Sequence, residues 1–139
     1  MMNVTMWLEP YHNSILILGL TGALSLLQLL LFDLMAIKLK HTPGHPVENN
    51  HRNILFRLSR AHANTNETMG ALILLFLFTL FTNADPLWVN RLMGAYFLSR
   101  VAHMFFYYLG WSMWRGIVFG LSLLSMIGLF VIGLLAWLV

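Results

Sequence analysis

Four long runs of hydrophobic residues follow one another along this chain, separated by short polar segments. The runs cover residues 14–38, 53–81, 87–109 and 113–138, and each is long enough, at about twenty residues, to cross a bilayer as a helix. The segments between them have turn composition, such as HTPGHPVENNHRN at 41–53 and TNADP at 82–86. Asp85 is predicted to cap the third helix, with Pro86 at its first position. The pattern predicts an all-α integral membrane four-helix bundle, in one domain over residues 1–139.

The composition is typical of a membrane protein. Of 139 residues, 59% are hydrophobic and 9% are charged, and the mean hydropathy is +0.75. Soluble domains carry about 25% charged residues, so we expect the lipid bilayer to be the main partner of this chain. The net charge is +3, but basic residues stand singly between apolar runs, which argues against nucleic-acid binding. The absence of cysteine excludes disulfides, thiolate metal sites and a cysteine nucleophile.

Basic residues gather at two of the three connections between the runs. The first connection and its flanks carry Lys38, Lys40, Arg52 and Arg57, and Arg115 follows the third. Only Arg91 lies near the opposite side. The positive-inside rule therefore predicts that both connections are cytoplasmic and that both termini lie on the non-cytoplasmic side. The start lacks the features of a cleaved signal peptide, so we expect the first segment to be retained.

Aromatic and small residues indicate how the helices sit in the membrane. Aromatic residues near the segment ends are interpreted as interfacial anchors, namely Trp7, Tyr11, Trp88, Trp111, Trp114 and Trp137. Small residues in the first and last segments favour close helix contacts, namely Gly19, Gly22, Ala23, Gly116, Gly120, Gly128 and Gly133.

A polar stripe opens the second segment. Arg57, Arg60, Asn64 and Glu67 are spaced by three, four and three residues, so they share one face of a helix. The run that follows them, residues 69–81, carries no charge. Ionisable groups at membrane depth are functional candidates, so this stripe is the first candidate site.

A second stripe lies on the third segment. Arg100, His103 and Tyr107 share a face, and Arg115 opens the fourth segment at the same expected depth. Several cationic groups with a single glutamate suit a small anion that has carboxylates and an amino group. Arginine binds carboxylates in bidentate fashion, and Glu67 can receive an ammonium.

Structural interpretations compete with this one. Arg100 and Glu67 can form an ion pair that locks two helices together, and Arg57 and Arg115 can reach lipid phosphates. His62 lies off the stripe and is expected to bond to a neighbouring helix. Asp33 is expected to make a helix-end or inter-helix contact. The spacing of His41, His45 and His51 matches no metal-ligand pattern, so we expect no metal site.

The two stripes resemble motifs of the MAPEG family, the membrane-associated proteins in eicosanoid and glutathione metabolism. Its signature R-x-x-R-A-H-x-N-x-x-E is matched by Arg57, Arg60, Ala61, His62, Asn64 and Glu67. The segment with Arg100, Val101, Ala102, His103 and Tyr107 looks like the third-helix motif of the prostaglandin synthase branch. Arg115 falls where that branch has an arginine at the start of its fourth helix. The resemblance covers essentially the whole chain.

The resemblance implies a homotrimer that binds glutathione between subunits near the cytoplasmic face, with a lipophilic small-molecule substrate arriving from the bilayer. The family's glutathione-contacting positions are matched by Arg60, Asn64, Glu67, His103, Tyr107 and Arg115. Lys38 stands roughly at a position that some members fill with arginine. Lys38 and Arg100 are also predicted to bind glutathione. Arg115 is the predicted catalytic residue, because a nearby cation lowers the pKa of the glutathione thiol and favours the thiolate. Glutathione would be a co-substrate, without a metal.

Three positions depart from the prostaglandin synthase pattern. Ala63 replaces an arginine, Gly116 replaces a serine and Phe119 replaces a tyrosine, which argues against the specialised isomerase reaction. A glutathione transferase or peroxidase active in detoxification is the preferred hypothesis. A non-catalytic lipid- or glutathione-binding protein of the same family is the alternative. A small transporter is a third, disfavoured because the chain shows neither inverted repeats nor broken helices.

Overall fold

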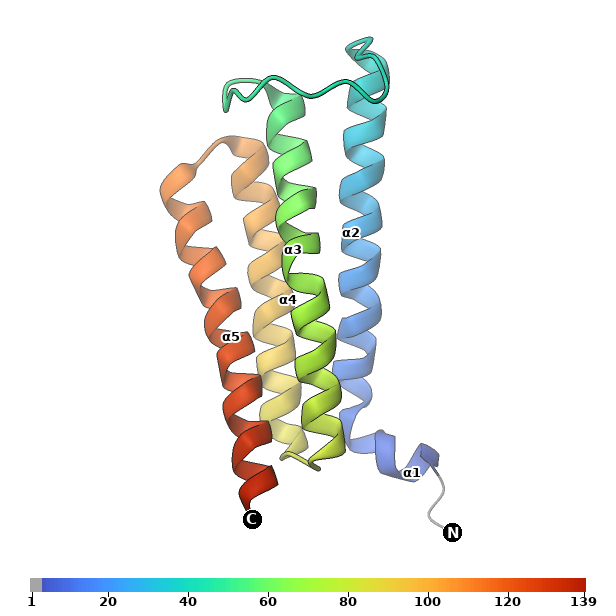
Figure 1. Cartoon of the computed structure of the whole chain (residues 1–139), viewed down its shortest axis with the longest axis vertical. Coiled ribbons are helices and arrows are strands. Elements are labelled where there is room, and N and C mark those ends of the chain that lie inside the picture. The colour runs from blue at the N-terminus through green and yellow to red at the C-terminus, as the bar shows by residue number, and fades with distance from the viewer. Residues whose placement is uncertain (1–3) are drawn as a thin grey trace.

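The computed structural model describes residues 4–139, and these residues form helices joined by short connections (Figure 1). A short helix α1 (Val4–Leu8) and a 3-10 turn η1 (Glu9–Tyr11) lead into four long helices. These are α2 (His12–Lys38), α3 (Ile54–Phe81), α4 (Pro86–Leu109) and α5 (Ser112–Leu138). They agree with the four predicted segments to within two residues at every end, so the expectation of four long helices is confirmed.

Local signals set the ends of the helices. Asn53 accepts a hydrogen bond from the Leu55 amide (2.9 Å) at the start of α3. Asp85 accepts one from the Leu87 amide (2.9 Å) at the start of α4, as predicted. These side chains satisfy amides that a first helical turn leaves unpaired. α4 ends at Gly110, whose φ of 76° glycine adopts without strain, and the chain turns there into α5.

The four long helices run alternately up and down (Figure 1). The α2–α3 loop and the α4–α5 turn lie at one end of the bundle, here called the loop end. The α3–α4 turn, α1 and the end of α5 lie at the other, here called the terminal end. α3 and α4 contact each other and both of the outer helices, α2 and α5. Side chains of α3 and α4 therefore fill most of the interior.

The helices differ in how well they suit lipid. α2 with the residues before it, α3 and α5 are long and apolar enough to cross a membrane. α4 has 24 residues but is not apolar enough by the same measure, which differs from the prediction that all four segments cross the membrane. The reason is its polar content, which includes Asn90, Arg91, Arg100 and His103. Because Arg100 and His103 are buried against the other helices, α4 keeps these groups away from lipid.

Apolar side chains pack the terminal half of the bundle. The buried cluster consists of Tyr11, Leu72, Phe76, Leu80, Ala84, Val89, Met93, Tyr96, Met126 and Leu129. Gly128 and Gly133 let α5 approach it closely, because a Cβ at either position would lie within 3 Å of the side chain of Leu92 or Phe78. Gly19, Gly22, Gly116 and Gly120 face open space in this chain. The predicted close contacts are therefore made by Gly128 and Gly133 and not by these four.

Two of the predicted membrane anchors form hydrogen bonds that hold the terminal end together. Trp7 donates its indole N–H to Asn83 Oδ1 (2.7 Å), and Tyr11 donates its hydroxyl to the Ala84 carbonyl. Tyr11 is only 3% exposed. Interpretation of Tyr11 as an interfacial anchor was therefore wrong, since its ring is part of the core and its hydroxyl is satisfied by the α3–α4 turn.

Candidate anion-binding site in the loop half of the bundle

Arg100 forms the buried centre of the candidate site. Its side chain is 0% exposed, and its guanidinium donates to Asn64 Oδ1 (2.8 Å), to the Asn64 carbonyl (3.3 Å) and to Thr68 Oγ1 (2.6 Å). The Thr68 hydroxyl also shares a hydrogen bond with the Tyr96 hydroxyl (2.8 Å). The interpretation of Arg100 and Glu67 as an ion pair was therefore wrong. Arg100 bonds to the amide and hydroxyl groups of α3, and Glu67 pairs with Arg60 instead.

Arg60 and Glu67 form an ion pair on the surface of α3. Arg60 Nη1 lies 3.8 Å from Glu67 Oε1, and Asn64 Nδ2 donates to Glu67 Oε2 at 3.4 Å. The predicted common face is confirmed for these three residues. The side chains of Arg60 and Glu67 are 42% and 55% exposed. Charges this exposed on a membrane-spanning helix need water, a ligand or a further chain around them.

Arg115, Tyr107 and His103 form a second group between α4 and α5. The Arg115 guanidinium lies 4.3 Å from the centre of the Tyr107 ring, and the His103 ring meets Tyr107 edge-on at 5.0 Å. Tyr107 and His103 are buried. Within residues 4–139 the Arg115 side chain makes no hydrogen bond and no ion pair. Its N–H donors are therefore available to an anion, while Tyr107 holds its flat face.

Phe119 joins these two groups. Its ring centre lies 5.4 Å from the Arg100 guanidinium and 6.1 Å from the His103 ring. One continuous contact series therefore runs through Arg60, Glu67, Asn64, Arg100, Phe119, His103, Tyr107 and Arg115. Lys38 is the predicted site residue outside this series. It is exposed at the end of α2 and forms no hydrogen bond or ion pair with any described residue.

Arg57 forms its hydrogen bonds with the protein backbone. Its Nη1 donates to the carbonyls of His51 (2.9 Å) and Arg52 (3.2 Å) in the α2–α3 loop. The sequence suggested lipid phosphates as its partner, and the structure instead gives it a structural role in the loop. The reason is the path of the loop, which brings two carbonyl groups within reach of the first turn of α3.

A separate polar seam joins α3 to α2. His62 Nε2 pairs with Asn66 Nδ2 (2.9 Å), and Asn66 Oδ1 accepts from Ser25 Oγ (2.7 Å). His62 was expected to bond to a neighbouring helix, but its partner is Asn66 of its own helix, and Asn66 makes the contact with α2. One turn along α2, Gln28 is 0% exposed and neither of its amide atoms has a partner among the described residues.

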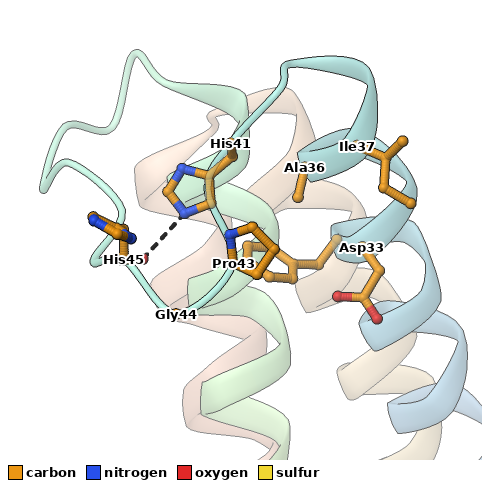
Figure 2. A pocket seen from close by; sticks show the side chains of 8 residues that line it. Asp33, Ala36, Ile37, His41, Pro43, Gly44 and His45 are labelled. Atoms are coloured by element: carbon orange, nitrogen blue, oxygen red, sulfur yellow. Dashed lines mark hydrogen bonds between the residues drawn. The ribbon is translucent and has the colours of Figure 1, made fainter.

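A cavity of about 490 Å³ lies beside the start of the α2–α3 loop, and none of the residues of the contact series lines it (Figure 2). Its lining consists of Phe32, Asp33, Ala36, Ile37, His41, Pro43, Gly44 and His45. His41 Nε2 lies 3.1 Å from the His45 carbonyl. Asp33 is exposed and makes no ion pair with a described residue. In residues 4–139 no three histidine or acidic side chains converge as metal ligands do.

Thr68 and Tyr96 were missed by the sequence analysis, although both hold Arg100 in place. A signal for each was present in the helical periodicity. Thr68 lies four residues after Asn64, and Tyr96 lies four residues before Arg100, so each shares a face with a predicted site residue. Neither residue is ionisable at neutral pH, which is why a search for buried charge passed over them.

A family comparison identifies the class of protein to which this chain belongs. Residues 14–135 match the MAPEG family, and the match covers nearly the whole chain and every residue of the contact series. No curated protein matches the chain. The match and the three membrane-spanning helices together identify an integral membrane protein from a family of glutathione-related transferases and synthases. The chain therefore belongs to the MAPEG family.

Proposed function

We propose that the protein is a membrane glutathione transferase that conjugates or reduces lipophilic electrophiles. The observation that carries the proposal is the contact series, which has a single acid, Glu67, at one end and the unpaired Arg115 at the other. Glutathione carries two carboxylates, one ammonium and a thiol, so it needs several cations and one acid. Glu67 receives the ammonium, Arg60 receives a carboxylate, and Arg115 faces the sulfur.

Arg115 activates the thiol in this proposal. A guanidinium beside the sulfur stabilises the thiolate, which is the nucleophile, and lowers the pKa of the thiol. Tyr107 holds Arg115 in place, and His103 packs edge-on against Tyr107, so both are proposed to line the thiol end of the site. Arg100 was predicted to bind glutathione, but its full burial and three hydrogen bonds suit a positioning role. It fixes Asn64, which in turn orients Glu67.

The reaction requires no group from the protein in the bonds that change. In conjugation the thiolate forms a carbon–sulfur bond, and the electron pair passes to the electrophile, which releases its leaving group or takes up a proton. In hydroperoxide reduction the O–O bond breaks, and two glutathione molecules are oxidised to the disulfide while the alcohol and water form. Both reactions gain from a fixed cation that stabilises negative charge on sulfur.

The exposed Arg60–Glu67 pair supports a homotrimer. This pair is exposed on the surface of α3, a helix long and apolar enough to cross a membrane, and lipid would not solvate it there. A second copy of the chain packed against this face would cover the pair and would enclose glutathione between subunits. Both termini are then proposed to lie on the non-cytoplasmic side, with the site near the cytoplasmic face, as the distribution of basic residues predicts.

An apolar groove between α3 and α5 supports a lipophilic second substrate. It has a volume of about 350 Å³ and is lined by Leu75, Leu123, Met126, Ile127 and Phe130. Its lining has no polar surface. Residues 115, 119, 123, 127 and 130 lie on one face of α5, so the groove continues the stripe that Arg115 and Phe119 begin. A hydrocarbon chain in this groove would point its reactive end toward Arg115.

Glutathione binding in detergent, with the ultraviolet absorbance of the thiolate as readout, tests the proposal. The native chain is expected to bind glutathione and to show the thiolate band, and Arg115→Ala is expected to lose the band. Arg91→Ala is the matched control, because Arg91 lies on α4 and stacks on Trp88 outside the contact series. Absence of binding at millimolar glutathione contradicts the proposal.

The same experiment addresses the non-catalytic alternative. Gly116 supports that alternative, because it has no side chain that could act on the thiol. The space that a side chain would occupy at this position is open. A binding protein would retain glutathione or lipid without the thiolate band. Binding of glutathione by the native chain without that band therefore favours a binding protein over a transferase.

A further inference from the structure

The end of the α2–α3 loop lies against the candidate site. The His51 ring is nearly parallel to the Tyr107 ring, with centres 6.5 Å apart and an angle of 28°. It also meets the Phe56 ring edge-on at 5.0 Å. Tyr107 is the ring over which the Arg115 guanidinium lies. His51 and the Arg115 guanidinium therefore both contact the Tyr107 ring.

The backbone around His51 is well fixed. The Asn53 amide donates to the Asn50 carbonyl (2.9 Å), and the Arg52 amide donates to Asn50 Oδ1 (2.9 Å). Asn53 is also the N-cap of α3. Residues 50–53 thus form a turn that is continuous with α3, and the position of His51 follows from the position of that helix.

Arg57 fastens this turn to the bundle. Its donation to the carbonyls of His51 and Arg52 takes up one nitrogen of the guanidinium. A Cβ at Gly110 would lie 3.9 Å from Arg57 Cδ, so the stem of Arg57 passes along the α4–α5 turn. Arg57 therefore ties the loop to the turn that follows Tyr107, the residue whose ring His51 contacts.

We propose that His51 is a ligand-contacting residue of the glutathione site and that Arg57 is the residue that positions it. This inference rests on the proposed function. The His51 side chain is exposed, and its ring nitrogens have no hydrogen-bond partner within residues 4–139. One ring N–H can therefore be donated to a ligand.

The charges around His51 assign it to one end of glutathione. The one acid of the contact series, Glu67, lies at the far end and is the partner for the ammonium of the glutamyl group. His51 contacts the rings of Tyr107 and Phe56, its carbonyl accepts from Arg57, and the Arg115 guanidinium lies over the same Tyr107 ring. The glycyl carboxylate, which carries no neighbouring ammonium, fits this end and accepts the His51 N–H.

Glutathione and its glycyl amide, which lacks that carboxylate, are the probes for the test. The native chain is expected to bind the amide about 10-fold more weakly than glutathione, the size of one hydrogen bond to a charged group. His51→Ala is expected to bind glutathione about 10-fold more weakly and to show no further loss with the amide. The thiolate absorbance per bound glutathione is expected to be unchanged, because Arg115 is intact. His45→Ala, in the same loop, is the control and should behave as the native chain.

Arg57→Ala provides the second variant. It is expected to weaken glutathione binding and leave binding of the glycyl amide unchanged, a difference that a general loss of folding cannot produce. The inference is overturned if His51→Ala binds glutathione as tightly as the native chain, or if it loses as much affinity for the amide as for glutathione. If the native chain binds no glutathione at all, the proposed function fails first, and this inference falls with it.

Discussion

The terminal half and the loop half of the bundle use the same four helices but different kinds of side chain. The terminal half is packed with apolar groups around Leu72, Phe76 and Leu129, and Trp7 and Tyr11 bond to the α3–α4 turn. In the loop half the buried side chains include Gln28, Thr68, Arg100, His103 and Tyr107, and the partly buried Asn64 bonds to Arg100. One half is built by burial of apolar surface, and the other by directed contacts between polar groups.

This difference shows which half of the bundle needs no partner beyond the chain itself. Apolar packing has no directional requirement and is satisfied within a single chain. A buried polar atom needs a partner, and several in the loop half have none among the described residues, including both amide atoms of Gln28, Arg100 Nε, His62 Nδ1 and His103 Nδ1. The terminal half therefore stabilises the fold by itself, whereas the loop half is arranged for further partners such as water, a ligand or a second chain.

The largest effect is expected from removal of the free cation in the loop half. Arg115→Ala should lower glutathione-dependent turnover by about 100-fold or more, the loss typical of one group that stabilises developing negative charge. The free energy of unfolding should change little, because the Arg115 side chain has no hydrogen bond within the described chain. Turnover of a lipophilic electrophile and thermal unfolding in the same detergent check both parts. Equal loss of stability and activity would contradict the division between the halves.

A core substitution in the terminal half should give the opposite result. Leu72→Ala removes a side chain that is 0% exposed and should lower the free energy of unfolding by about 3 kcal/mol. Glutathione affinity, measured at a temperature where the variant is folded, should match that of the native chain. A large loss of affinity in the folded variant would show that packing in the terminal half controls the site.

A substitution at the boundary between the two halves should affect both stability and glutathione binding. Thr68→Val keeps the shape of the side chain but removes the hydroxyl that Arg100 and Tyr96 share. The loss should be about 2 kcal/mol of unfolding free energy, together with weaker glutathione binding because Asn64 is held less firmly. Serine restores the hydroxyl, so Thr68→Ser should retain most of both quantities and serves as the control.

At Gln28 a substitution is expected to raise the free energy of unfolding, where Leu72→Ala and Thr68→Val lower it. Since its two amide atoms are buried without a protein partner, Gln28→Leu should raise the free energy of unfolding by about 1 kcal/mol. Thermal unfolding of the two chains side by side provides the measurement. A lower stability of Gln28→Leu would instead mean that water or a ligand in the loop half bonds to this amide.

The smallest effect is expected at Lys38, the predicted site residue outside the contact series. Lys38→Ala should change glutathione affinity by no more than about 2-fold, as for other exposed surface positions. Titration with glutathione beside the Arg60→Ala variant, which should bind far more weakly, gives the contrast. A loss at Lys38 comparable with that at Arg60 would place α2 in the site, through another copy of the chain.

Much of the fold and part of the site were open to prediction from the sequence. Hydrophobic runs and capping residues such as Asp85 fixed the helices to within two residues, because these signals act locally. Helical spacing placed Arg60, Asn64 and Glu67 on one face for the same reason. The partners were harder to predict. Arg100 bonds to Asn64 and Thr68 instead of Glu67, and Tyr11 packs in the core, because partners depend on how each helix is rotated.

Four long helices in a membrane protein, with polar stripes on the second and third, could thus be predicted from the amino-acid sequence, since periodicity and hydrophobicity are properties of each segment alone. Only the tertiary structure decided that these stripes join through Phe119 into one series and that Arg57 is spent on the loop. It also decided that His51 lies beside Tyr107. Those contacts link residues far apart in the chain, and their geometry follows from the packing and the loop path, which no single segment encodes.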